Sequence, residues 1–210
     1  IINDNKNYYA KWKEASIDME GKYYYTLKEA IDSIDTSDEV TINLLKDITE
    51  DNEITAEKNI VLDLQGHTLH NVSKSAINNY GILKITNGVV DSTSTTDATI
   101  NNKAAATLVL DGGSYITNGS KQVIYNDGGN TTIKGNATIY SIGNQRAAIQ
   151  NLKNGTLTLE SCTIEAVNQT AVRNESGTLI IGIDDDIIDN SLVTIIGKPY
   201  GIYTSPNIYL

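Results

Sequence analysis

Short stretches in which apolar and polar residues alternate recur along most of the chain, as in residues 83–85 and 157–159. A period of two places successive side chains on opposite faces of a strand, whereas an amphipathic helix needs apolar residues three and four positions apart. Thr, Ile and Tyr, which favour strands, are abundant, and frequent Asn and Gly favour the turns between strands. The pattern therefore predicts an all-β chain of many short strands.

These strands fall into a repeat with three phrases per unit. The first phrase closes with an asparagine that recurs every 23 to 25 residues, and the second ends in an apolar residue at intervals of 22 to 26 residues. A third apolar phrase follows in each unit. The recurring asparagines are Asn79, Asn102, Asn126, Asn151 and Asn174. Like residues in register in every unit predict a right-handed parallel β-helix of about seven coils, with three strands per coil.

The inward positions of such a helix should form columns along its axis. Coils stacked about 4.8 Å apart would bring the recurring asparagines one above another, so that each side-chain amide donates to one neighbour and accepts from the other. A second column, of small residues, is expected two positions before the third apolar series Val90, Ile116, Ile139, Ile164 and Ile195; its members are Gly88, Ser114, Ala137, Cys162 and Val193. Cys162 is then an inert core thiol.

The repeat extends back to about Val40, and a different pattern precedes it. Residues 26–29, Thr-Leu-Lys-Glu, match a capping box, and an apolar stripe predicts a short helix over roughly 27–34 that covers the open first coil. We therefore assign 14–39 to a strand and capping helix and 40–210 to the β-helix. At the far end, residues 201–204 restart the first phrase with Thr in place of Asn, and we expect the solenoid to be truncated there.

Composition and charge limit the partners that the chain can have. The net charge of −10 over 210 residues disfavours nucleic acid and anionic lipid surfaces. No apolar run approaches the roughly 18 to 20 residues that cross a bilayer. The single cysteine excludes an internal disulfide, and with only two histidines the chain lacks a zinc site of recognisable spacing. We expect no metal, no cofactor and no membrane insertion.

Two segments resemble known families. Residues 62–69, Leu-Asp-Leu-Gln-Gly-His-Thr-Leu, and the coils that follow resemble the pectin-lyase-like β-helices of large surface proteins of Firmicutes and related bacteria, over about residues 40 to 204. Residues 8–12, Tyr-Tyr-Ala-Lys-Trp, look like the closing strand of the Listeria–Bacteroides type repeat, which makes 1–13 the tail of a preceding module. Alternatively, Trp12 packs on the capping helix. The resemblance implies an extracellular, secreted or cell-surface protein whose other modules belong to the same parent chain.

Carbohydrate-active enzymes of this superfamily place their chemistry on an exposed face. Lyases need clustered acidic calcium ligands with an Arg or Lys base, and hydrolases need paired aspartates. The outward column of the first strand contains no carboxylate: Asn78, Asn101, Tyr125, Gln150, Arg173 and Tyr203. A second outward column alternates in charge and predicts a salt ladder: Thr86, Asp111, Lys134, Glu160 and Gly182. We find no catalytic set in either column.

Two other groups of side chains are of types that can carry chemistry. His67 and His70 have no carboxylate or further histidine at ligand spacing, so we expect turn and surface residues. The run Asp184-Asp185-Asp186, in the long insertion 182–190, is either a solvated acidic loop or a calcium-binding one, although it lacks the spacing of an EF-hand.

The remaining candidate site is a recognition surface on the first strand. Tyr125, Gln150, Arg173 and Tyr203 would place two aromatic rings and two polar donors on one flat sheet, where they could stack on sugar rings and bind hydroxyls. We therefore expect a non-catalytic adhesin or stalk module that binds glycan or a host ligand. The alternatives are a carbohydrate-active enzyme whose site lies on missing coils or on the insertion 182–190, and a pure structural spacer.

Overall fold

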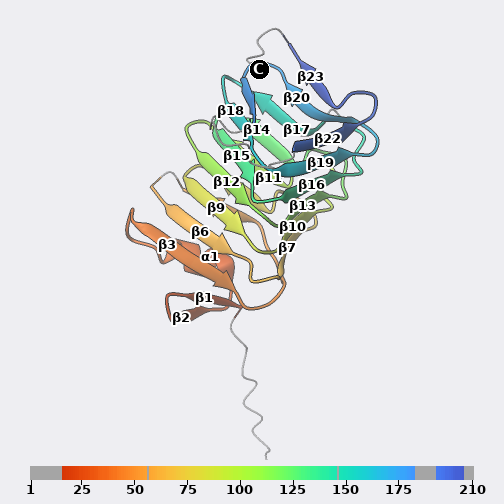
Figure 1. The fold of residues 1–210 in the computed structure, drawn as a ribbon. Helices are drawn as coiled ribbons and strands as arrows, with labels where there is room; N and C mark the ends of the chain where they lie inside the picture. Colours follow the sequence, from red (N-terminus) through yellow and green to blue (C-terminus); the bar gives the residue numbers. More distant parts are fainter. Residues whose placement is uncertain (1–15, 56, 146, 183–192, 206–210) are drawn as a thin grey trace, which may run out of the picture.

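The computed structural model describes residues 16–55, 57–145, 147–182 and 193–205, and in these ranges the chain is a parallel β-solenoid with one short helix (Figure 1). The predicted all-β parallel β-helix is thereby confirmed. Each coil contributes one strand to each of three sheets, and each sheet holds seven solenoid strands joined by parallel pairing. The predicted tail 1–13, Trp12 and the run Asp184-Asp185-Asp186 lie outside the described residues.

The three sheets are named A, B and C in the order in which the chain visits them. Sheet A contains β3 (Glu39–Leu44), β6 (Asn59–Asp63), β9 (Ile82–Thr86), β12 (Thr107–Asp111), β15 (Asn130–Lys134), β18 (Thr156–Leu159) and β21 (Thr178–Ile181). Sheet B contains β4 (Ile48–Thr49), β7 (Thr68–Asn71), β10 (Val89–Ser92), β13 (Ser114–Thr117), β16 (Ala137–Ser141), β19 (Cys162–Ala166) and β22 (Val193–Gly197). Sheet C contains β5 (Asn52–Ile54), β8 (Ile77–Asn79), β11 (Ile100–Lys103), β14 (Ile124–Asp127), β17 (Ala147–Leu152), β20 (Thr170–Asn174) and β23 (Ile202–Thr204).

The asparagine column is buried and continuous, as predicted. Each of the first four side-chain amides donates from Nδ2 to Oδ1 of the asparagine one coil further on, and all five residues are at most 1% exposed. The four N–O distances are 2.8 Å (Asn79 to Asn102), 3.0 Å (Asn102 to Asn126), 2.7 Å (Asn126 to Asn151) and 2.8 Å (Asn151 to Asn174). The same Nδ2 atoms also donate to main-chain carbonyls of the next coil, so the ladder holds neighbouring coils together inside the core.

An N-terminal cap covers the first coil, as Figure 1 shows at the lower end of the solenoid. The hairpin of β1 (Ile17–Met19) and β2 (Lys22–Tyr24) pairs antiparallel with β3 and so occupies the edge of sheet A. Helix α1 (Leu27–Asp32) begins at the predicted capping box and ends two residues before the predicted Ile34. Its Ser33 Oγ donates to the Ala30 carbonyl and caps the last turn at that point.

Side chains of the solenoid hold this cap in place at both of its ends. The Glu50 carboxylate accepts hydrogen bonds from the main-chain N–H groups of Leu27 and Lys28, each at 3.2 Å. Lys58, itself buried, donates from Nζ to the Ile34 carbonyl at 3.0 Å. The cap therefore packs its apolar stripe on the core while charged side chains of the first coils satisfy its polar ends.

The predicted inward register of sheet B is wrong by one residue in β13. Tyr115 points inward and is fully buried, and Ile116 faces outward, because Tyr115 and not Ile116 pairs with Ile139. The core accepts the tyrosine because its hydroxyl donates to the Gly112 carbonyl at 3.0 Å and approaches the Ile85 carbonyl at 3.3 Å.

The small-residue column shifts with this register. Gly113, not Ser114, lies in it, and a Cβ built on Gly113 would approach the Gly88 carbonyl oxygen to 2.8 Å. Ser114 instead faces outward and its hydroxyl bonds that of Thr138 at 2.7 Å. The close approach of the two backbones explains why the column requires glycine at this level.

Substituting Asn126 by alanine should destabilise the fold by about 3 kcal/mol, because it removes the bond that Asn102 donates to it and leaves the buried Asn151 Oδ1 without its donor. Urea or guanidinium unfolding followed by circular dichroism measures this loss. The matched control is Asn130→Ala, since Asn130 is exposed on the outer face of sheet A and should tolerate the change. An equal loss in both variants would contradict a structural role for the ladder.

Candidate functional site

The predicted surface column lies on the outer face of sheet C with the predicted register. Parallel pairing aligns the six positions one above another along β8, β11, β14, β17, β20 and β23: Asn78, Asn101, Tyr125, Gln150, Arg173 and Tyr203. Their side chains differ greatly in exposure, from the fully buried Gln150 to Tyr203, which is 42% exposed. Alignment alone therefore does not make these residues equal contributors to a site.

A groove of about 350 Å³ lies over the middle of this column. Its floor contains Asn101, Tyr125 and Gln150 of sheet C. Its wall comes from the connections between sheets B and C in successive coils, at Thr96, Asp97, Ala98, Lys121, Gln122 and Gln145. Lys103, at the end of β11, also lines it. Because each coil adds one connection to the wall, the groove is built by the stacking of coils.

Gln150 occupies the floor but offers no free carboxamide group to an incoming ligand. Its Oε1 accepts from Gln122 Nε2 at 2.5 Å, and its Nε2 donates to Glu175 Oε1 at 2.9 Å. The residue is 0% exposed. It therefore connects the wall residue Gln122 with Glu175, and it supports the groove from beneath.

Arg173 and Tyr203 lie beyond the groove, toward the C-terminal coils. The Arg173 guanidinium lies over the Tyr203 ring at 4.9 Å from its centroid, and Arg173 Nε contacts the Glu175 carboxylate in an ion pair. Neither Arg173 nor Tyr203 lines the groove. Of the four predicted site residues, Tyr125 is the one whose side chain can meet a ligand in the groove directly.

Positive side chains outnumber negative ones in the groove lining, although the chain as a whole is negatively charged. Lys103 and Lys121 line it, with Asp97 as the carboxylate on the wall, whereas the chain carries a net charge of −10. Among the ion pairs of the described residues, none involves Lys103 or Lys121. Asp127, close by on β14, is paired with Lys153 at 2.8 Å. Two ammonium groups are thus available to a ligand.

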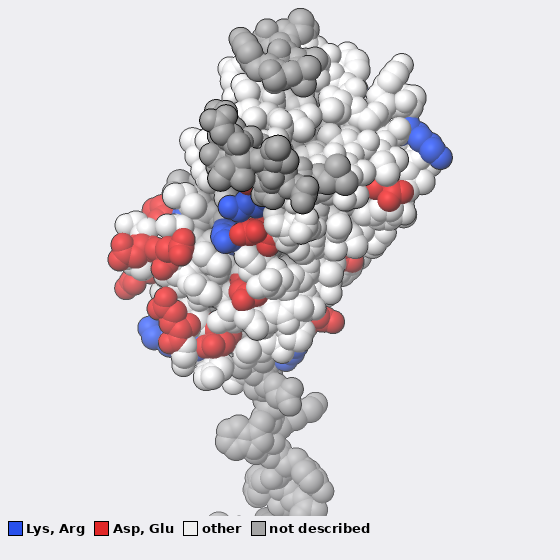
Figure 2. All heavy atoms as spheres, in the orientation of Figure 1, with Lys and Arg blue, Asp and Glu red and all other residues white. Residues whose placement is uncertain are grey.

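Figure 2 shows where acidic side chains gather on one face of the molecule. On that face, Asp and Glu gather over the N-terminal coils with few Lys or Arg beside them, and the described upper part is largely uncharged.

One charged contact on the outer face of sheet A corrects the predicted salt ladder. Asp111 pairs diagonally with Lys84 at 2.8 Å instead of with Lys134, the residue directly beside it in the column.

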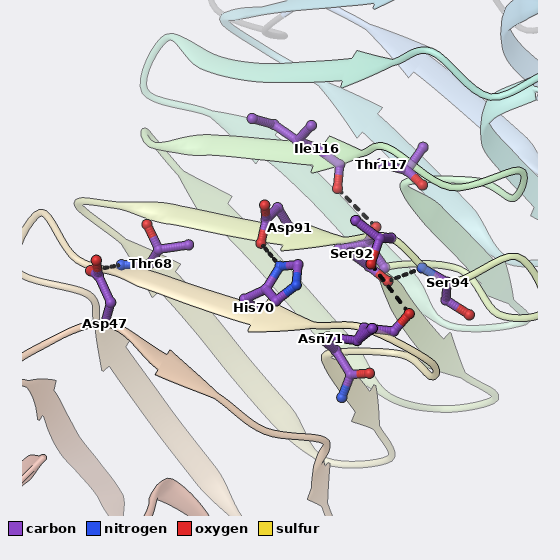
Figure 3. A network of polar contacts seen from close by, with 12 residues as sticks. Asp47, Thr68, His70, Asn71, Asp91, Ser92, Ser94, Ile116 and Thr117 are labelled. Atoms are coloured by element: carbon purple, nitrogen blue, oxygen red, sulfur yellow. Dashed lines mark hydrogen bonds and ion pairs between the residues drawn. The ribbon is translucent and has the colours of Figure 1, made fainter.

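His70 has an acidic partner that we did not predict. His70 on β7 and Asp91 on β10 point toward each other on the outer face of sheet B, with Nδ1 and Oδ1 2.5 Å apart (Figure 3). His67, in the turn before β7, lies 3.5 Å from Asp47, and Asp47 also accepts from the Thr68 N–H. The 21-residue spacing of the early coils contained the signal, since it places position 91 directly above position 70.

In the part of the chain that the structure describes, no group of three or more His, Cys, Asp or Glu side chains could hold a metal ion. No helix within those ranges is long and apolar enough to span a membrane.

Sequence reasoning missed Gln122 and Glu175, which flank the predicted column. Glu175 follows Arg173 by two residues, so strand alternation places both on one face and could have found it. Gln122 precedes β14 and reaches Gln150 from a connection whose path the sequence does not specify.

Comparison of the chain with protein-family models, with curated proteins and with solved structures finds no match. The family-level resemblance of residues 40–204 therefore rests on the sequence motifs alone, and the structure supports it to the level of a parallel β-solenoid.

Cys162 should be nearly unreactive in the folded chain. It is 2% exposed between Ala137 and Val193, and burial raises the pKa of its thiol to about 11. At pH 8 only about one thiol in a thousand would then be a thiolate, and it would be shielded from reagents. Labelling with Ellman's reagent at pH 8 should be slow in the native chain and complete in guanidinium. Rapid labelling of the native chain would contradict this.

Proposed function

We propose that this chain is a non-catalytic recognition module of a bacterial secreted or cell-surface protein, and that it binds glycan in the groove over sheet C. The observation that carries the proposal is the groove itself, which combines an aromatic side chain with polar groups on a rigid floor. Pockets that bind sugars need such a combination, because sugar rings present both apolar C–H faces and hydroxyl groups.

The residues of the groove have complementary chemistry for a sugar. Tyr125 offers a ring face and a hydroxyl, and Gln122 and Gln145 offer side-chain amides. Asn101 offers its oxygen, because its NH₂ group donates to Ser75 and Asn78. Lys103 and Lys121 add cationic donors without ion-pair partners in the described residues. Because the strands beneath are hydrogen bonded across seven coils, little conformational entropy would be lost when a ligand binds.

The non-catalytic part of the proposal rests on the content of this groove. Asp97 is the only carboxylate among the described residues that line it, whereas a glycosidase uses a pair of carboxyl groups on either side of the bond that breaks. The pair of His70 and Asp91 lies on sheet B, on a different face of the solenoid. We therefore favour binding over cleavage.

The surface location and the pectin-lyase-like family are likewise part of this proposal. They are supported by the motif of residues 62–69, in which Leu62, Leu64 and Leu69 point inward and Gln65 and Gly66 form a turn with positive φ. A rigid parallel solenoid is suited to projecting a binding surface from a cell. Other modules of the parent chain would anchor it.

A glycan array probed with the intact chain, with and without calcium, tests the proposal. Specific binding is expected, and Tyr125→Ala should weaken it about tenfold, which corresponds to about 1.4 kcal/mol of lost stacking. The control is Tyr140→Ala, because Tyr140 is an outward tyrosine on sheet B, 36% exposed and remote from the groove lining. Absence of binding by the wild type would favour a structural spacer, and equal weakening by both variants would exclude this site as the place of binding.

A further inference from the structure

We propose that Glu175, which does not line the groove, fixes the hydrogen-bonding polarity of the groove through two buried amides, so that the wall presents a permanent acceptor at Gln122 Oε1. Glu175 is then a positioning residue for the binding site. The ligand that the groove takes must carry a donor, such as a hydroxyl or an acetamido N–H, at this point. The part of this inference that concerns the ligand rests on the proposed function.

The first step is the carboxylate of Glu175. An ionised carboxylate can only accept hydrogen bonds, whereas a glutamine carboxamide can present either an oxygen or an NH₂ group in nearly the same shape. Glu175 contacts Gln150 at 2.9 Å, and the group of Gln150 that faces it must therefore be the NH₂. Arg173 pairs with the same carboxylate and lies on Tyr203, and these contacts hold Glu175 in position.

The second step follows from the geometry of the Gln150 carboxamide. Because its NH₂ group faces Glu175, its oxygen faces the other way, toward Gln122 at 2.5 Å. An oxygen there requires a donor, so Gln122 must turn its NH₂ group toward Gln150. Gln150 is fully buried and Gln122 is 6% exposed, and water can therefore not easily replace either contact.

The third step concerns Gln122, the last residue in this series of hydrogen-bonded side chains. One N–H of the Gln122 NH₂ group is committed to Gln150, which fixes the orientation of the carboxamide, and among the described residues the Gln122 Oε1 has no hydrogen-bond partner. Gln122 lines the groove, and the groove is where this oxygen can find a donor.

The consequence is selectivity that Glu175 controls from outside the groove. Lys103 and Lys121 are donors, so they favour acceptor groups of a ligand, whereas Gln122 Oε1 requires a donor, as the Asp97 carboxylate on the same wall and the Asn101 oxygen on the floor also do. A ligand that places an ether or another acceptor at Gln122 Oε1 would leave two acceptors facing each other. Sugars, which carry hydroxyl donors beside acceptors, meet both requirements.

A stability cycle tests the polarity without any ligand. Gln122→Glu puts a second acceptor-only group against Gln150 Oε1 and should lower the melting temperature by several degrees. Adding Glu175→Gln should lower the melting temperature less in this background than in the wild type, where it also removes the contacts with Arg173 and Gln150, because Gln150 can then turn its NH₂ group toward the carboxylate at position 122. The matched control adds Glu165→Gln, which removes the same charge from the outer face of sheet B and should have the same effect in both backgrounds.

Additive losses in the double variant, or an equal difference between the two backgrounds for Glu165→Gln, would overturn the inference. Neutron crystallography of the wild-type chain gives a second reading that needs no variant to fold. Deuterons on the side of Gln150 that faces Glu175 are expected, and deuterons on the side that faces Gln122 would also overturn it.

Array binding tests the ligand part separately. If the wild type binds neutral oligosaccharides, their per-O-methylated forms should lose binding at least tenfold, and retention of binding would refute the donor requirement. If the wild type binds no glycan while the stability cycle behaves as expected, the proposed function fails and the polarity of the amide chain stands.

Discussion

The buried asparagine ladder is the interaction on which the rest of the structure depends. A polar column in the core is stable only if every amide finds its partner in the next coil, so each coil must stack in register with its neighbours. Glycines beside the ladder follow from the same constraint. A Cβ on Gly155 or Gly177 would lie 2.8 Å and 2.3 Å from the Nδ2 atoms of Asn126 and Asn151, respectively. The ladder thus fixes both the stacking of strands and the composition of the adjacent turns.

Registered stacking also creates the outer surface on which a ligand could bind. The inward asparagine and the outward column residue are neighbours on the same strand of sheet C, as with Asn126 and Tyr125, so the ladder sets the level of the groove floor. The connections between sheets B and C then add one wall segment per coil. The floor is rigid for the same reason that the core is, while the chemistry of the wall varies with the connections.

Periodicity in the sequence was sufficient to predict whatever repeats in the structure. The three-strand coil, the ladder, the capping box at Thr26 and the alignment of Tyr125 with Gln150 all follow from spacing. The register of β13 did not, because Tyr115 and Ile116 are both apolar and the choice depends on carbonyl groups that can receive a tyrosine hydroxyl. The groove and its amide chain also escaped prediction, since they arise from the paths of connections and from diagonal contacts.

The direction of the asparagine ladder has an electrical consequence. Every amide along it donates toward the C-terminal coils, so the side-chain dipoles add instead of cancelling. As in an α-helix, aligned dipoles amount to partial charges at the two ends, here negative at Asn79 and positive at Asn174. The solenoid therefore has an internal electrical polarity, and a coil stacked on it in the reverse sense would set donor against donor or acceptor against acceptor. A single row of side chains therefore permits coils to stack in only one orientation.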